Sequence, residues 1–173
     1  DALPISNQAD VVMALAASGR TPFAIAALEQ ARLTGALAIA MVNNPGSALE
    51  QAADIAILLD TGPEFIAGST RMKAGTAQKV ALNVISTGVM IRLGFVYRGL
   101  MVEMRPTNAK LRERSVRMVM ELTGADDAAV RTTLEQAGGV IKLATVMLLL
   151  KLDRAGAQAA LDRAGGNLRK ALA

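Results

Sequence analysis

Short apolar runs alternate with helix-like segments in the first third of the chain, and this alternation limits the possible folds more than any other feature. The runs lie at residues 9–17, 37–42 and 55–59. Between them, residues 23–34 carry apolar side chains at helical spacing, and residues 47–53 form a shorter helical segment. Apolar runs separated by helices are typical of parallel strands that are buried on both faces of a sheet. The pattern therefore predicts an α/β fold with the order β-α-β-α-β.

From Ser69 onward the pattern is helical throughout. Residues 69–93 are predicted to form one long helix with a face of small side chains. We expect this face to pack on the chain's own sheet; the alternative is that it forms an interface between two copies of the chain. The helical segments that follow begin with the amphipathic residues 108–122, so we expect a small helical bundle, with the chain divided into residues 1–99 and 100–173. These segments are residues 108–122, 128–137, 140–152, 154–163 and 167–172.

Three parallel strands make a thin sheet, and such a sheet usually has neighbours on each edge. The chain also begins with Asp1, close to its first predicted strand. We therefore expect either a piece of a larger protein or a sheet that another polypeptide completes.

The residue types present restrict the chemistry and the partners. The 173 residues include no Cys and no His, so we expect no metal, no cofactor and no chemistry beyond that of carboxylates, hydroxyls, Lys, Arg and backbone groups. The net charge of +4 mildly favours anionic ligands, but three Phe and one Tyr cannot supply stacking platforms for a nucleic acid. The longest apolar stretch, residues 140–152, is too short to cross a bilayer, and we expect no signal peptide. We expect a cytoplasmic protein with no nucleic-acid or membrane partner.

The sequence Ser18-Gly19-Arg20-Thr21-Pro22 ends the first predicted strand and opens the first predicted helix. Gly19 allows a close backbone approach, Ser18 and Thr21 offer hydroxyls, and the first helical turn offers N–H groups and the positive end of the helix dipole. This loop lies where ligands collect in open α/β sheets, at the carboxyl ends of the strands. Spacing alone leaves two readings open: an anion site that includes Arg20, or a turn glycine followed by an N-cap threonine.

A second loop, residues 61–73, follows the third predicted strand and opens the long helix, so it lies at the same edge of the sheet. Ser69 or Thr70 is the predicted N-cap, which places Arg71 and Lys73 in the first helical turn. Basic residues there oppose the helix dipole, and a bound anion would relieve that conflict. The alternative is that both side chains point into solvent. The carboxylate of Glu64 has two readings as well: it orients or deprotonates a ligand, or it belongs to a turn.

At these two loops the sequence resembles the N-acetylmuramic acid 6-phosphate etherases of the sugar isomerase (SIS) domain superfamily. The resemblance covers nearly the whole chain, and the second of its four segments is the most specific. The segments are LAASGRTPFAIAALEQAR (residues 15–32), GPEFIAGSTRMKAGTAQKVALNVIST (62–87), LMVEMRPTNAKLRERSVRMV (100–119) and GGNLRKAL (165–172).

The resemblance implies a partial SIS-type parallel sheet flanked by helices, followed by an all-helical C-terminal region. Residues 1–99 would be the second half of a phosphosugar-binding domain. The family enzymes are dimeric bacterial lyases that convert N-acetylmuramic acid 6-phosphate to N-acetylglucosamine 6-phosphate and D-lactate, without metal, by elimination and water addition. The matching positions would bind the phosphosugar; they are Ser18, Gly19, Arg20, Thr21, Glu64, Ser69, Thr70 and Lys73.

One departure from the family is important. The family carries an earlier Gly- and Ser-rich loop and two catalytic glutamates in its N-terminal half, and this chain contains neither. Ether elimination needs one group to remove a proton and another to protonate the departing lactate. We therefore expect no catalytic residue in this chain and no activity from it alone. The alternatives are a non-catalytic sugar-phosphate regulator, a sugar-phosphate isomerase, and an oligomerisation module whose loops bind nothing.

Overall fold

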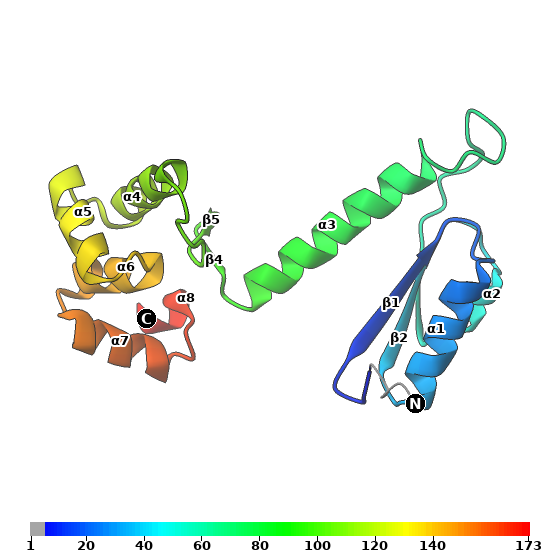
Figure 1. The fold of residues 1–173 in the computed structure, drawn as a ribbon, viewed down its shortest axis with the longest axis horizontal. Coiled ribbons are helices and arrows are strands. Elements are labelled where there is room, and N and C mark those ends of the chain that lie inside the picture. Colours follow the sequence, from blue (N-terminus) through cyan, green and yellow to red (C-terminus); the bar gives the residue numbers. More distant parts are fainter. Residues whose placement is uncertain (1–5) are drawn as a thin grey trace. The chain divides into compact units, whose positions relative to one another are not determined.

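The computed structural model describes residues 6–173, which divide into two compact units after Ile85. The first unit holds a parallel sheet with its helices, and the second is mostly helical (Figure 1). The long helix α3 (Ala74–Arg92) runs across the division. The α/β class predicted from the alternating runs is confirmed by this arrangement.

The first unit is built on three parallel strands in the order β1-β2-β3. Connecting helices lie on one face of this sheet (Figure 1). The predicted strand and helix positions are confirmed to within three residues at each end. The strands are β1 (Val11–Ala16), β2 (Leu37–Val42) and β3 (Ile55–Leu58), and the helices are α1 (Pro22–Leu33) and α2 (Ala48–Gln51).

Only one face of the sheet has a helical cover among the described residues. Small side chains on that face let α1 approach closely and bury Leu28 and Leu49 completely. On the other face Val11, Leu15 and Ile55 are exposed. The expectation of strands buried on both faces is therefore wrong for this part of the chain, because both connecting helices lie on the same face of the sheet. The buried cluster is Ala14, Ala16, Ala24, Leu28, Ala38, Ala40, Val42 and Leu49.

The helix α3 begins later than the sequence predicts and is less buried. Residues 70–73 form turns, so the helix covers Ala74–Arg92 rather than 69–93. Ala74 is the only buried residue of this helix. The expectation that its small-residue face packs on the sheet is not met in the described chain. The spacing of apolar residues predicts that a segment is helical, but it does not predict which part of the protein packs against the helix.

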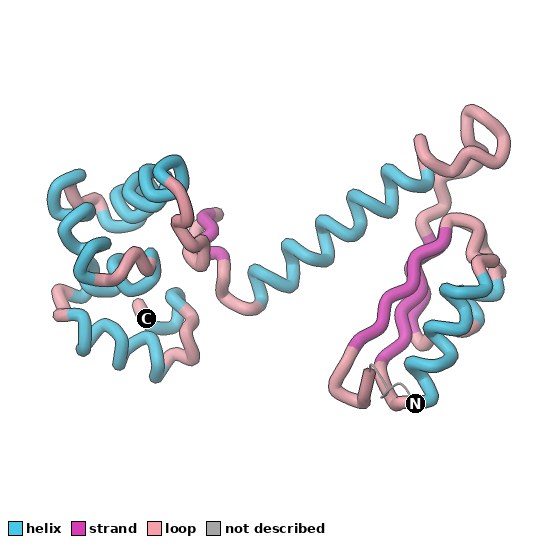
Figure 2. Tube along the Cα trace, in the orientation of Figure 1, coloured by secondary structure: helices cyan, strands magenta, loops and turns pink. Residues whose placement is uncertain are grey.

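After the end of α3, the second unit contains a two-stranded antiparallel hairpin and then five helices. The hairpin, β4 (Val96–Tyr97) and β5 (Leu100–Met101), was not predicted, because strands of two residues have no periodicity (Figure 2). The helices match the predicted segments within two residues at each end. They are α4 (Ala109–Thr123), α5 (Asp127–Gln136), α6 (Ile141–Leu150), α7 (Arg154–Arg163) and α8 (Leu168–Ala171).

The helices of the second unit share one core. Val119, Val130 and Val146 are completely buried in it, contributed by α4, α5 and α6. Within residues 6–173 no single helix is long and apolar enough to cross a membrane. The pair α5 and α6 reaches that length and composition only together, and the two helices are bent by 118° to each other.

Candidate functional site

The loop between β1 and α1 is held in shape by its own backbone and by the neighbouring turn before α2. Gly19 donates its N–H to Ala16 O (3.0 Å) and accepts at its carbonyl from Leu49 N–H (2.9 Å). Its φ of +65° lies in the left-handed region, and a Cβ at this position would overlap the Ser47 side chain. Glycine is therefore required for both reasons. The Ser47 hydroxyl is buried and has no hydrogen-bond partner among the described residues.

The start of α1 is open to a ligand. Thr21 occupies the N-cap position, but its side chain makes no cap hydrogen bond, and Pro22 is the first helical residue. The Ser18 hydroxyl accepts the N–H of Arg20 (3.3 Å), so it remains able to donate. Ser18, Arg20 and Thr21 are exposed. The first turn of α1 thus keeps N–H groups and a positive dipole end without a side-chain cap, as an anion site requires.

The second loop is organised by Glu64 rather than by a hydroxyl. The Glu64 carboxylate accepts from the N–H groups of Lys73 (3.0 and 3.1 Å) and Ala74 (3.0 Å) at the start of α3. The prediction that Ser69 or Thr70 caps this helix is therefore wrong. The reason is that a carboxylate from nine residues upstream occupies the cap, which local sequence does not reveal.

The basic residues of this loop precede the helix and lie outside its first turn. Lys73 Nζ donates to the carbonyl of Pro63 (2.8 Å), and Arg71 Nε donates to Ser69 Oγ (2.9 Å). The Glu64 carboxylate already supplies negative charge at the start of α3, so the basic side chains give no argument for a bound anion. Thr70 and Lys73 are exposed and Ser69 is half-buried.

The charge on Glu64 is stabilised by its partners. The N–H groups of Ala74 and Lys73 hold the pKa of the carboxyl below its ordinary value of 4.5. A carboxylate with a lowered pKa and both oxygens bonded to backbone is a poor proton carrier at neutral pH. Of the two readings of Glu64, the geometry favours the structural one.

The two loops leave the same end of the sheet, after β1 and β3, with β2 between them (Figure 1). No hydrogen bond or ion pair joins residues 18–21 to residues 62–73 in the described chain. The second loop has a surface hollow of about 520 Å³ lined by Phe65, Ile66, Ser69, Arg71 and Met72. Whether both loops hold one ligand stays a prediction. Among residues 6–173 no cluster of acidic side chains could hold a metal ion.

Asn43 is a residue of this region that the sequence did not indicate. It is buried at the carboxyl end of β2 and bonds to the segments on both sides of that strand. Its partners lie up to 35 residues away along the chain, so no local pattern could have revealed it.

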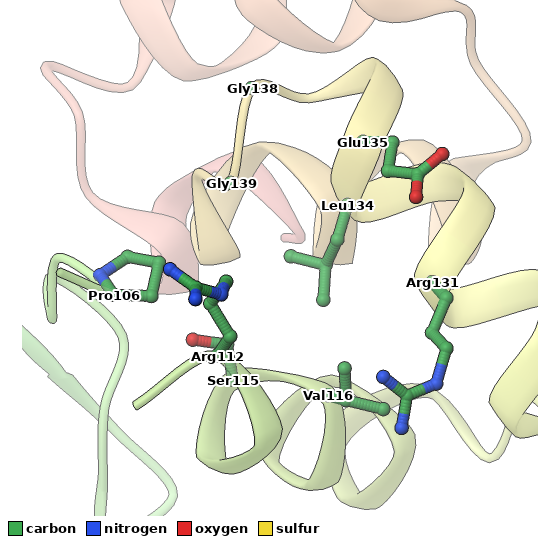
Figure 3. A pocket seen from close by; sticks show the side chains of 9 residues that line it. All are labelled: Pro106, Arg112, Ser115, Val116, Arg131, Leu134, Glu135, Gly138 and Gly139. Carbon is green, nitrogen blue, oxygen red and sulfur yellow. The ribbon is translucent and has the colours of Figure 1, made fainter. Parts of the chain in front are cut away.

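A second hollow lies in the helical unit, between α4 and α5 (Figure 3). Its volume is about 500 Å³, and its walls include Arg112, Val116 and Leu134. Arg131 also lines it, but the guanidinium is held by Glu113 (2.8 Å) and Asp127 (2.7 Å). The sequence did not predict this hollow, and none of the predicted site residues contributes to it.

The fold and the loops together define a class of protein: a parallel α/β chain that presents Ser- and Gly-containing loops at the carboxyl ends of its strands. The SIS domain family model matches residues 1–87, and the chain belongs to that family.

Relatives of known name agree with this assignment. The chain is 60% identical over 140 residues to an N-acetylmuramic acid 6-phosphate etherase of Symbiobacterium thermophilum, covering 81% of this chain and 47% of the relative. It is 51% identical over 163 residues to the etherase of Deinococcus radiodurans, covering 94% and 53%. With the Klebsiella aerogenes etherase the identity is 50% over 170 residues, covering 98% and 56%. The chain thus spans about half the length of the curated relatives that it matches.

Proposed function

We propose that this chain is the phosphosugar-binding part of an etherase, a lyase that converts N-acetylmuramic acid 6-phosphate to N-acetylglucosamine 6-phosphate and D-lactate. The observation that carries the proposal is the open start of α1 beside Ser18 and Thr21, in a chain 60% identical to an etherase over 140 residues. The etherase would act as a homodimer in the bacterial cytoplasm.

In this proposal the first loop binds the phosphate ester. The Ser18 and Thr21 hydroxyls donate to phosphate oxygens, the uncapped N–H groups of α1 add further donors, and Arg20 adds positive charge. Gly19 supports this by keeping the backbone in the left-handed conformation that the loop needs. Ser69, Thr70 and Lys73 would close the pocket from the second loop, and Glu64 would hold that loop in place.

The reaction itself needs groups from outside this chain. Elimination removes the proton beside the sugar carbonyl and breaks the carbon–oxygen bond to lactate, whose oxygen takes up a proton; water then adds to the double bond. Within residues 6–173 Glu64 is the carboxylate of the site, and its bonding to Lys73 and Ala74 opposes a proton-transfer role. We therefore expect the chain alone to bind without releasing D-lactate.

A fusion tests the proposal. The amino-terminal half of the Symbiobacterium thermophilum relative is joined to this chain, and D-lactate release from N-acetylmuramic acid 6-phosphate is measured. We expect activity from the fusion and none from the chain alone. Ser18→Ala and Thr21→Ala in the fusion should each lower kcat/KM about tenfold or more, because each removes a hydrogen bond to a charged group.

Thr132→Ala is the matched control, since this exposed hydroxyl bonds only to Ala128 O in its own helix. A fusion that melts cooperatively and yet releases no D-lactate would refute the etherase proposal.

A sugar-phosphate regulator is the second candidate, favoured by the bonding of Glu64 to backbone. A regulator binds several sugar phosphates and turns none of them over. Stabilisation of the fusion by N-acetylglucosamine 6-phosphate, without D-lactate release, would support this candidate.

A further inference from the structure

Asn43 occupies the end of the middle strand and contacts the segments on both sides of it. Its backbone N–H donates to Ala17 O (3.1 Å), and its Nδ2 donates to Leu59 O (2.7 Å). Its Oδ1 accepts from Gln78 Nε2 of α3 (2.9 Å). One residue thus bonds to three segments that are far apart in the sequence.

The three hydrogen-bond partners of Asn43 lie close to the two loops. Ala17 immediately precedes the first loop, Leu59 lies two residues before the start of the second loop, and Gln78 lies in the helix that follows the second loop. Asn43 therefore holds the entrance of both loops and the exit of one.

The side-chain amide of Asn43 is held in one orientation. The residue is only 9% exposed, and both ends of its side-chain amide have partners. A buried amide that is bonded at both ends resists reorientation, because turning it would bring its oxygen against the carbonyl of Leu59. The first loop has a further anchor on the same turn, since Asn44 Nδ2 donates to Ala17 O (2.9 Å).

A ligand that contacts both loops must span the width of β2. The strands on either side of β2 are about 10 Å apart, two strand spacings. A hexose phosphate can bridge that width, whereas inorganic phosphate reaches only one loop.

We propose that Asn43, together with Gln78, is a positioning pair that fixes the separation of the two loops so that one phosphosugar can contact both. This inference rests on the proposed phosphosugar site. The pair acts through the loops and does not itself touch the substrate.

Two ligands of different size separate this role from simple stabilisation. Binding of N-acetylglucosamine 6-phosphate and of inorganic phosphate to the full chain is measured by calorimetry, at a temperature where every variant is folded. Asn43→Ala removes the bonds to Leu59 and Gln78 but keeps the backbone bond to Ala17. We expect it to weaken phosphosugar binding about tenfold. Phosphate binding should stay within about twofold of wild type.

Gln78→Ala is the second variant, and it keeps the test decisive if Asn43→Ala fails to fold. It should weaken phosphosugar binding about fivefold, because one hydrogen bond is lost. The double variant should bind no more weakly than Asn43→Ala, since Gln78 acts only through Asn43. Asn83→Ala is the control: it lies exposed on the same helix and should leave both affinities unchanged.

A readout without ligand completes the test. Asn43→Ala and Gln78→Ala should speed amide hydrogen exchange in residues 59–73 more than in residues 18–21. Equal loss of affinity for both ligands, no loss for either, or unchanged exchange in residues 59–73 would overturn the positioning role. If the two variants show the expected exchange pattern but the wild-type chain binds neither ligand, the result would instead count against the proposed phosphosugar site.

Discussion

Gly19 combines two constraints that can be separated by substitution. Its φ of +65° is unfavourable for any residue with a Cβ, and a Cβ there would also overlap Ser47. Gly46 in the following turn has a similar φ of +69°, but a Cβ there meets nothing within 4 Å. The two glycines therefore differ in steric crowding and share the backbone constraint.

We expect Gly46→Ala to cost about 1–2 kcal/mol of unfolding free energy, from the left-handed backbone alone. Gly19→Ala should cost about 1–3 kcal/mol more, because Ser47 must move. Urea unfolding of both variants measures the difference. Adding Ser47→Gly to Gly19→Ala should recover the additional loss of unfolding free energy. If Gly19→Ala and Gly46→Ala instead lose the same unfolding free energy, the overlap with Ser47 is relieved at no cost in stability.

The residues of the first loop could be predicted from sequence, while the residues that hold it could not. Ser18, Gly19 and Thr21 are consecutive or nearly so, and a loop between a strand and a helix is a local pattern. Asn43 and Ser47 act on that loop from the next turn, across strand pairing that sequence does not specify. Their roles follow only from the fold.

At the scale of elements, the start of α3 depends on Glu64. Its carboxylate bonds to Lys73 N and Ala74 N, and these bonds lower its pKa below 4.5. A carboxyl whose pKa is lower in the folded chain stabilises the fold above its unfolded pKa, and this stability is lost as pH falls through the folded pKa.

Glu64→Gln should therefore lower the melting temperature at pH 7, and the difference from wild type should shrink as the pH falls below 4.5. Thermal unfolding by circular dichroism between pH 7 and pH 3 measures it. Glu29→Gln is the matched control, because Glu29 is exposed on α1 and has no partner among the described side-chain bonds. A constant difference across this pH range would contradict a charged cap.

The helices of the second unit were predictable because their ends carry local signals. Asp126 and Asn108 cap α5 and α4 with their own side chains, and Gly124 ends α4 at a φ of +71°. The start of α3 lacked such a signal, because its cap comes from Glu64 across a loop. Capping from a distance and two-residue strands are the features that periodicity does not detect.

At the scale of the whole molecule, the two units differ in how completely they cover their apolar surface. In the first unit one face of the sheet exposes Val11, Leu15 and Ile55, and α3 exposes Val80 and other apolar side chains. Exposed apolar surface of this kind is typical of sites that bind other polypeptides, membranes or ligands. The relatives are about twice as long as their match to this chain.

The second unit carries a closed core of its own, which predicts that it folds independently. Val119, Val130 and Val146 are completely buried there by α4, α5 and α6. We expect residues 86–173 alone to be helical and to melt cooperatively, and residues 1–85 alone to self-associate or to melt without cooperativity. Circular dichroism and analytical ultracentrifugation of the two fragments measure this.

A pair of valine substitutions tests whether that melting comes from the core. Val119→Asp should unfold the fragment of residues 86–173, because a charge would be buried without a partner. Val140→Asp should not, since Val140 is 48% exposed at the start of α6. If the wild-type fragment melts without cooperativity, or if the two aspartate variants behave alike, the helical unit depends on the rest of the protein for its stability. Independent folding would mean that exposed apolar surface limits the stability of the first unit and not that of the second.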